Sequence, residues 1–122
     1  MKRDIDLVRK LLLTMEQCEH GFAPRKLEIE GYTNAEIGYH ALLMDEAGLI
    51  VALEVTCSGD ETPFAEPVRM TWAGHDFLDA CRDEGRWQKA KRIIDEKVKG
   101  ASFDIIKLIL LEIMKEQVNR AF

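Results

Sequence analysis

Residues 33–55 have the sequence TNAEIGYHALLMDEAGLIVALEV, and this stretch decides the fold. Thr33 and Glu36 have the spacing of a capping box, and apolar residues at helical spacing follow them as far as Gly48. The next residues, Leu49 to Val55, are rich in branched side chains, which favours a β-strand. The stretch therefore predicts a helix over about 34–46, a glycine stop and then a strand.

The neighbouring segments extend this pattern in both directions. Residues 4–18 carry apolar side chains at the spacing of an amphipathic helix, and the alternation over 27–30 predicts a short strand. Residues 68–72 have the composition of a return strand that completes a hairpin. The long hairpin loop, 58–67, lacks apolar periodicity, so we expect it to be exposed and mobile.

The remainder of the chain is predicted to be helical. Thr71 or Gly74 begins a helix that Gly85 ends or bends. The basic stretch 86–99 follows and carries a single apolar stripe. We therefore expect consecutive helices after the hairpin.

Gly100 is the expected seam between a core of residues 1–99 and a carboxyl-terminal hydrophobic helix within 100–122. Ser102 is a suitable cap for that helix. Its apolar band, Phe103 to Val118, is wider than one core usually covers. Either other helices of the same chain cover the band or a second subunit does, and we expect a homodimer.

Composition limits the protein's class. The chain has 122 residues, 47% of them hydrophobic, which suits one ordinary soluble domain. No apolar run is long enough to cross a bilayer, and the amino terminus lacks the pattern of a secretory signal, so we expect a cytoplasmic protein. Cys18, Cys57 and Cys81 form no C-x-x-C pair, which indicates reduced thiols.

The order helix, short strand, helix, hairpin, helix resembles that of a winged-helix domain, and residues 39–50 resemble the helix-to-wing junction of bacterial regulators. More specifically, TWAGHDFLDACRD at 71–83, MKRDIDLVRK at 1–10 and Trp87 resemble DUF2513, a family of small bacterial and prophage proteins of unknown function. The resemblance covers about residues 1–99. It implies an α+β, winged-helix-like fold with a two- to three-stranded antiparallel hairpin, and it brings no catalytic residues.

One departure from the winged-helix pattern bears on function. A helix-turn-helix needs two helices between the first strand and the wing, and the second of them enters the major groove. Only residues 33–47 are available here, so the first helix is either reduced to a turn around Gly31 and Tyr32 or absent. The DNA-reading element is therefore expected to be incomplete.

Charge is divided unevenly within the net charge of −5. Residues 28–68 contain nine acids and no lysine or arginine, so this segment should repel DNA. We therefore expect a non-enzymatic protein-interaction or regulatory module that contacts a protein partner through its acidic face and hairpin loop. Tyr39 and His40 fit a half-buried flank of the second helix as well. The candidate contact residues are Glu36, Tyr39, His40, Asp60, Glu61, Phe64 and Glu66.

The alternative function is that of a DNA-binding transcriptional regulator that uses the basic helix 82–99. This segment has seven basic and four acidic residues, a modest excess that also suits a solvated helix face. Trp72 and Trp87 could form an aromatic platform for bases, although closing the core is the commoner role. The basic residues are Arg82, Arg86, Lys89, Lys91, Arg92, Lys97 and Lys99.

Catalytic and metal-binding patterns are weak. A metal site would combine Cys18 and His20 with His40 or His75, but the close ligand pairs of a structural zinc site are missing. His75 and Asp76 are adjacent, and adjacent residues on a helix do not face each other. The sequence contains no phosphate-binding glycine loop, H-E-x-x-H motif or nucleophile elbow. We expect no metal, no cofactor and no enzymatic activity.

Overall fold

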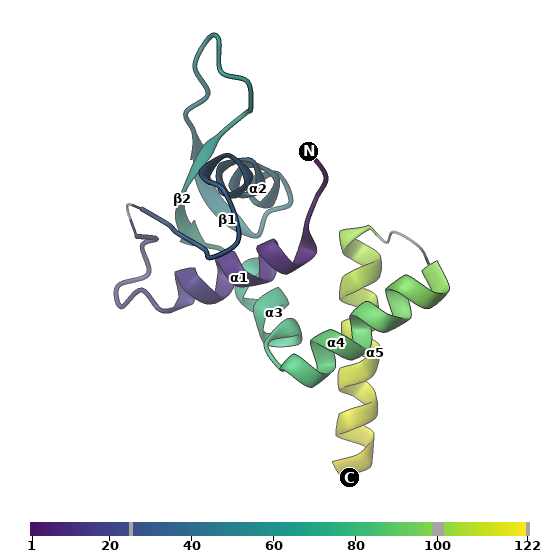
Figure 1. Ribbon diagram of the computed structural model, residues 1–122. Helices are drawn as coiled ribbons and strands as arrows, with labels where there is room; N and C mark the ends of the chain where they lie inside the picture. The colour runs from purple at the N-terminus through teal and green to yellow at the C-terminus, as the bar shows by residue number, and fades with distance from the viewer. Residues whose placement is uncertain (25, 99–101, 122) are drawn as a thin grey trace. The chain divides into compact units, whose positions relative to one another are not determined.

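The computed structural model describes residues 1–24, 26–98 and 102–121 (Figure 1). Its fold is α+β, as predicted, and it divides into two compact units, Met1–Asp76 (unit 1) and Phe77–Phe122 (unit 2). The elements in chain order are α1 (Ile5–Glu16), α2 (Asn34–Glu46), β1 (Ile50–Glu54), β2 (Ala65–Met70), α3 (Trp72–Cys81), α4 (Glu84–Ile93), the π-helical turn η1 (Ile94–Val98) and α5 (Phe103–Ala121).

Local capping chemistry sets the helix boundaries of unit 1. Asp4 caps α1, because its side chain accepts the backbone N–H groups of Asp6 and Leu7. The predicted capping box of α2 is confirmed, with reciprocal bonds of 3.1 and 3.0 Å between Thr33 and Glu36. The buried sides of α1 and α2 pack together and form the core with the start of β1. The buried side chains include Leu7, Leu11, Leu12, Ile37, Ala41, Met44 and Ile50.

The hairpin is antiparallel, with a β-bulge between Val51 and Ala52. Its return strand begins earlier than predicted, at Ala65, so the last three residues of the predicted loop belong to β2. The strand also ends earlier, because the Thr71 hydroxyl accepts the Gly74 N–H at 3.1 Å and starts α3 at Trp72. Thr71 is therefore the residue that begins this helix.

The predicted strand over residues 27–30 is wrong. Leu27 is buried and Glu28 is exposed, as the alternation implies, but these residues pair with no strand. They belong to the connector (residues 17–33), which turns where the Tyr32 N–H donates to the Ile29 carbonyl at 3.1 Å. Among the described residues of the connector, a turn therefore stands where a helix-turn-helix has its first helix. The winged-helix assignment itself stays a prediction.

Unit 2 corrects one predicted helix boundary and confirms another. Gly85 does not end or bend a helix, because α3 already ends at Cys81 and Gly85 lies in the first turn of α4. Asp83 caps α4, since its side chain accepts the Arg86 N–H at 2.7 Å. Ser102 caps α5 as predicted, since its hydroxyl accepts the Ile105 N–H at 3.4 Å. The expected seam at Gly100 lies outside the described residues.

Aromatic and apolar side chains are buried unequally. Trp87 is buried as expected, whereas Trp72, the first residue of α3, is 83% exposed and does not close the core. Part of the apolar band of α5 is exposed as well. Its buried members are Ile106, Leu110 and Ile113, and its exposed members are Ile105, Leu108, Leu111 and Val118. Among the described helices, none combines the length and apolar character needed to span a membrane.

Candidate partner-binding surface

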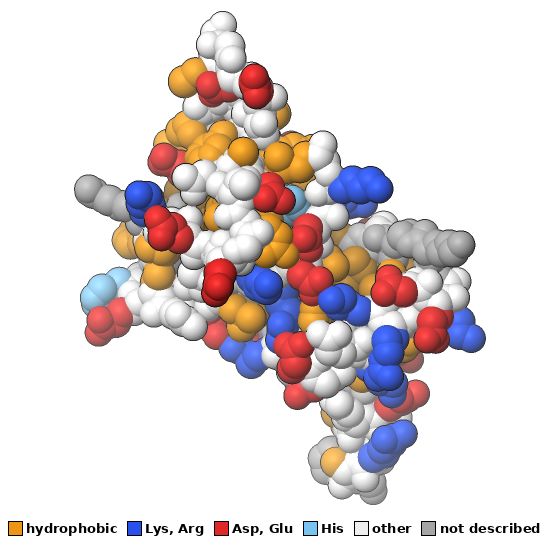
Figure 2. Space-filling view, in the orientation of Figure 1, with side chains coloured by type: hydrophobic (Ala, Val, Ile, Leu, Met, Phe, Trp, Pro, Cys, Tyr) orange, Lys and Arg blue, Asp and Glu red, His pale blue; other side chains and the backbone are white. Residues whose placement is uncertain are grey.

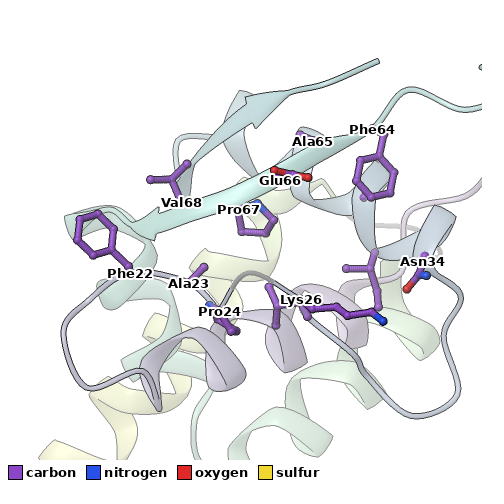
Figure 3. A pocket seen from close by; sticks show the side chains of 13 residues that line it. Phe22, Ala23, Pro24, Lys26, Asn34, Phe64, Ala65, Glu66, Pro67 and Val68 are labelled. Carbon is purple, nitrogen blue, oxygen red and sulfur yellow. The ribbon is translucent and has the colours of Figure 1, made fainter. Parts of the chain in front are cut away.

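A hollow of about 590 Å³ opens beside β2 in unit 1 (Figure 3). We call it the β2 groove. The connector forms one wall, β2 forms another, and the first turns of α2 close the end. Its lining is mainly apolar, and its polar side chains are Lys26, Asn34 and Glu66. The apolar side chains that matter below are Phe22, Pro24, Ile37, Phe64, Pro67 and Val68.

The connector approaches β2 at one end of the groove. It meets β2 at an isolated bridge between Phe22 and Arg69, and the Ala23 N–H donates to the Val68 carbonyl at 2.8 Å. Pro24 of the connector and Pro67 of β2 line the groove beyond this bridge, and neither has a backbone N–H to donate.

Phe64 forms the far wall of the groove, opposite Phe22 (Figure 3). Its ring lies so close to Gly38 of α2 that a Cβ at this position would overlap it. Its backbone N–H donates to the Thr56 hydroxyl at 3.0 Å, and its carbonyl accepts the Val55 N–H at 2.9 Å. These contacts hold Phe64 in place, whereas Phe22 is 68% exposed.

A second hollow of about 550 Å³ shares the Phe64 wall, and we call it the acidic hollow. Asp60 and Glu61 of the hairpin loop line it together with Ala35 of α2. The Asp60 carboxylate accepts the Cys57 N–H at 2.7 Å, which fixes the turn that presents Glu61. In Figure 2, acidic side chains near the hairpin tip lie above a cluster of hydrophobic ones.

Four of the predicted contact residues are therefore brought together. Phe64 and Glu66 line the β2 groove, and Asp60 and Glu61 line the acidic hollow beside it. Glu36 instead serves the capping box of α2.

His40 is a core residue, which corrects its expected place on a contact surface. It is 1% exposed and stacks edge-on against half-buried Tyr39. The Asp4 N–H donates to its Nε2 at 2.8 Å, so Nδ1 carries the ring proton and donates to the Glu36 carbonyl at 2.8 Å. His40 therefore ties the start of α1 to α2.

Tyr32 adds a second tie to the same point, and sequence reasoning missed it. Its hydroxyl donates to the other oxygen of Asp4, Oδ2, at 2.9 Å. Burial, this hydrogen bond and the nearby negative charges of Asp4, Asp6 and Glu36 raise the pKa of Tyr32 to about 12. The only sequence signal was the acid that caps α1.

Several residues of the alternative DNA surface have structural contacts within unit 2. Arg86 donates to the backbone carbonyls of Asp79 and Ala80, at 3.1 and 3.0 Å, which satisfies the end of α3. Arg82 pairs with Asp79 at 3.0 Å and Lys89 with Glu116 at 3.7 Å. Lys91 is half-buried, Arg92 and Lys97 are exposed, and Lys99 lies outside the described residues.

The structure brings three of the four candidate metal ligands to one hollow. Cys18, His20 and His75 line a hollow of about 440 Å³, whereas His40 does not. Within the described parts of the chain, no three histidine, cysteine, aspartate or glutamate side chains are grouped so that they could hold a metal ion. Cys57 is exposed and Cys81 is buried.

Comparisons with known proteins give a family and no activity. The family model described as "Hypothetical protein (DUF2513)" matches residues 2–102. An uncharacterized protein of Haemophilus influenzae is 31% identical over 119 residues, which cover 97% of this chain and 99% of that protein. No solved structure matches the chain.

Proposed function

The chain belongs to the DUF2513 family, and we propose that it is a non-enzymatic protein-interaction module whose contact surface is the β2 groove with the acidic hollow. One observation carries the proposal: an apolar hollow adjoins a cluster of carboxylates in a segment, 28–68, that has no lysine or arginine. Apolar patches rimmed by polar groups are typical of protein-binding sites. Nucleic acid would meet carboxylates there instead of the cations that phosphates require.

We also propose a cellular location and an origin for the protein. We place the protein in the cytoplasm, as a winged-helix-like regulatory module of bacterial or prophage type. The three cysteines are thiols, which suits a reducing compartment, and the Haemophilus relative is bacterial.

Site-specific photo-crosslinking in bacterial cells tests the proposal. A photoreactive amino acid replaces Glu61 in the acidic hollow, and Glu46, an exposed acid at the end of α2, is the matched control position. After nuclease treatment we expect discrete protein adducts from position 61 and none from position 46. Equal adducts from both positions, or no protein adduct from position 61, would refute the proposal.

The DNA-binding alternative is supported by the exposed Arg92 and Lys97, at the end of α4 and in η1. It requires retardation of duplex DNA at low salt and a steep loss of affinity as salt rises. The double variant Arg92→Glu, Lys97→Glu should then abolish retardation, while Glu61→Lys should not weaken it. That result, without protein adducts at position 61, would replace the first proposal.

A further inference from the structure

The β2 groove points to one kind of occupant. We infer that it receives an amphipathic α-helix of a partner protein, with the helix's apolar side chains in the groove and basic side chains over the acidic hollow. This inference rests on the proposed function, because it names the partner of the same surface.

The sheet edges disfavour the other common way of binding a peptide, the addition of a strand. On the outer edge of β1, the Asp45 carboxylate already accepts the Ala52 N–H at 2.9 Å. On the outer edge of β2, the Val68 carbonyl is bonded to the connector, and Pro67 has no N–H to donate. Because strand addition relies on main-chain hydrogen bonds, both edges are poor templates for it.

A helix suits this surface for the same reason. An extended segment would bring unpaired backbone N–H and C=O groups against walls made by Phe22, Pro24 and Val68, which offer no side-chain partners. A helix satisfies its own backbone and needs only side-chain contacts. Apolar residues three and four positions apart would enter the hollow between Phe22 and Phe64.

Charge determines which helix is accepted. Glu66 lines the groove, and Asp60 and Glu61 lie beyond Phe64. The cation on the groove wall, Lys26, lies 3.7 Å from the Glu28 carboxylate, which offsets its charge. A helix with lysine or arginine beside its apolar stripe is therefore attracted, and an acidic helix is repelled.

Three probe peptides of about 18 residues test the inference, each long enough for five helical turns. The first has leucines at helical spacing and lysines elsewhere, the second replaces lysine with glutamate, and the third shuffles the first so that the leucine period is lost. The full chain is titrated with each peptide and followed by amide NMR shifts. We expect saturable shifts around Phe22, Phe64 and Val68 with the first peptide, at least about tenfold tighter than with the others.

Matched variants locate the site. Phe22→Ser should lower the affinity for the first peptide by about tenfold. Trp72→Ser changes a more exposed aromatic residue outside the groove and should leave the affinity unchanged. Glu66→Lys should weaken it as well, and Glu46→Lys should not. Because these four side chains are exposed, the variants are expected to fold.

Each contrary result overturns the inference in a distinct way. Equal binding of the shuffled peptide means that only charge is recognised, and equal binding of the glutamate peptide removes the role of the acidic hollow. Shifts on α5 place the site elsewhere, and groove shifts that grow with protein concentration alone make a second copy the occupant. If the peptide results are contrary but position 61 still gives protein adducts, the interaction module stands and only the helical occupant is wrong. If position 61 gives no adducts, the proposed function itself fails.

Discussion

Unit 1 and unit 2 both leave large apolar side chains in solvent, but with different geometry. In unit 1, Phe22 borders a concave groove whose opposite wall, Phe64, is held by backbone hydrogen bonds and by Gly38. In unit 2, Leu108 and Leu111 belong to an exposed stripe on the convex surface of α5. A concave site selects an occupant by shape, whereas a convex stripe needs only another apolar surface. Unit 1 therefore suits a specific partner, and unit 2 suits self-association.

The largest expected effect tests whether close packing distinguishes unit 1. Gly74 lies so near the Leu49 carbonyl and the Met70 side chain that an added Cβ would overlap both. Because the carbonyl is backbone, the chain itself must shift, and Gly74→Ala should lower the free energy of unfolding by about 3 kcal/mol. Urea unfolding with an unchanged m-value measures this loss.

Gly85 in unit 2 provides the matched control. A Cβ there meets nothing closer than the Asp83 carboxylate at 3.4 Å, an ordinary contact. Gly85→Ala should therefore raise the free energy of unfolding, by up to about 1 kcal/mol. Equal losses from Gly74→Ala and Gly85→Ala would break the distinction between the units.

The next effect concerns the tie between α1 and α2. His40→Leu keeps a side chain of similar size but removes the acceptor of the Asp4 N–H. A partly buried donor without an acceptor should cost about 2 kcal/mol of unfolding free energy. The exposed His20 is the control, and His20→Leu should change stability by less than about 0.5 kcal/mol. A neutral His40→Leu would mean that packing alone holds the two helices together.

The accuracy of the sequence predictions follows from how local their causes are. The ends of α2 and the start of α5 were predicted because Thr33, Glu36, Gly48 and Ser102 act within a few residues of themselves. The start of β2 was missed because Pro67 resembles a loop residue, and only its pairing with distant β1 makes the segment a strand. The alternation of apolar and acidic residues over 27–30 likewise suggested a strand. Such alternation indicates that one face of the segment is buried, but it does not show that the backbone pairs with another strand.

The candidate site was half predictable for the same reason. Its acids were found because charge is visible in the sequence. The connector wall was not, because nothing local places Phe22 and Pro24 beside β2. His40 was assigned to a surface because its partner, Asp4, lies 36 positions away. Contacts of this kind follow from the tertiary fold.

The next prediction concerns self-association through the exposed apolar stripe of α5 in unit 2. If the α5 stripe pairs with a second copy, the protein should sediment at about twice the 14.0 kDa chain mass. Leu108→Lys places a charge on the stripe in both copies and should weaken dimerisation by at least about tenfold, since burying one leucine contributes roughly 2 kcal/mol. Unfolding of the monomer should change little, because Leu108 is 53% exposed.

A control variant and two contrary results test the dimer prediction. Glu112→Lys on the same helix is the control, because it adds the same side chain without removing an apolar one. A wild-type chain that sediments as a monomer at high concentration would show that the exposed stripe does not mediate self-association. Equal weakening by the two variants would attribute the effect to charge.

The smallest effect examines how firmly the connector, whose earlier residues line the groove, is held at Tyr32 near its end. The pKa of Tyr32 is raised from 10.0 to about 12, so the folded state favours the protonated phenol that donates to Asp4. This contribution to stability is complete below pH 10.0 and is lost as pH rises toward 12. Tyr32→Phe should therefore flatten the decline of stability over this range, and wild-type minus variant absorbance should show tyrosinate forming near pH 12. If both proteins decline equally, the Tyr32 contact does not hold the connector, and the bond between Ala23 and Val68 must position the wall that it forms. The β2 groove would then be less preorganised than the contrast with α5 requires, and part of its affinity for a partner would be spent on ordering it.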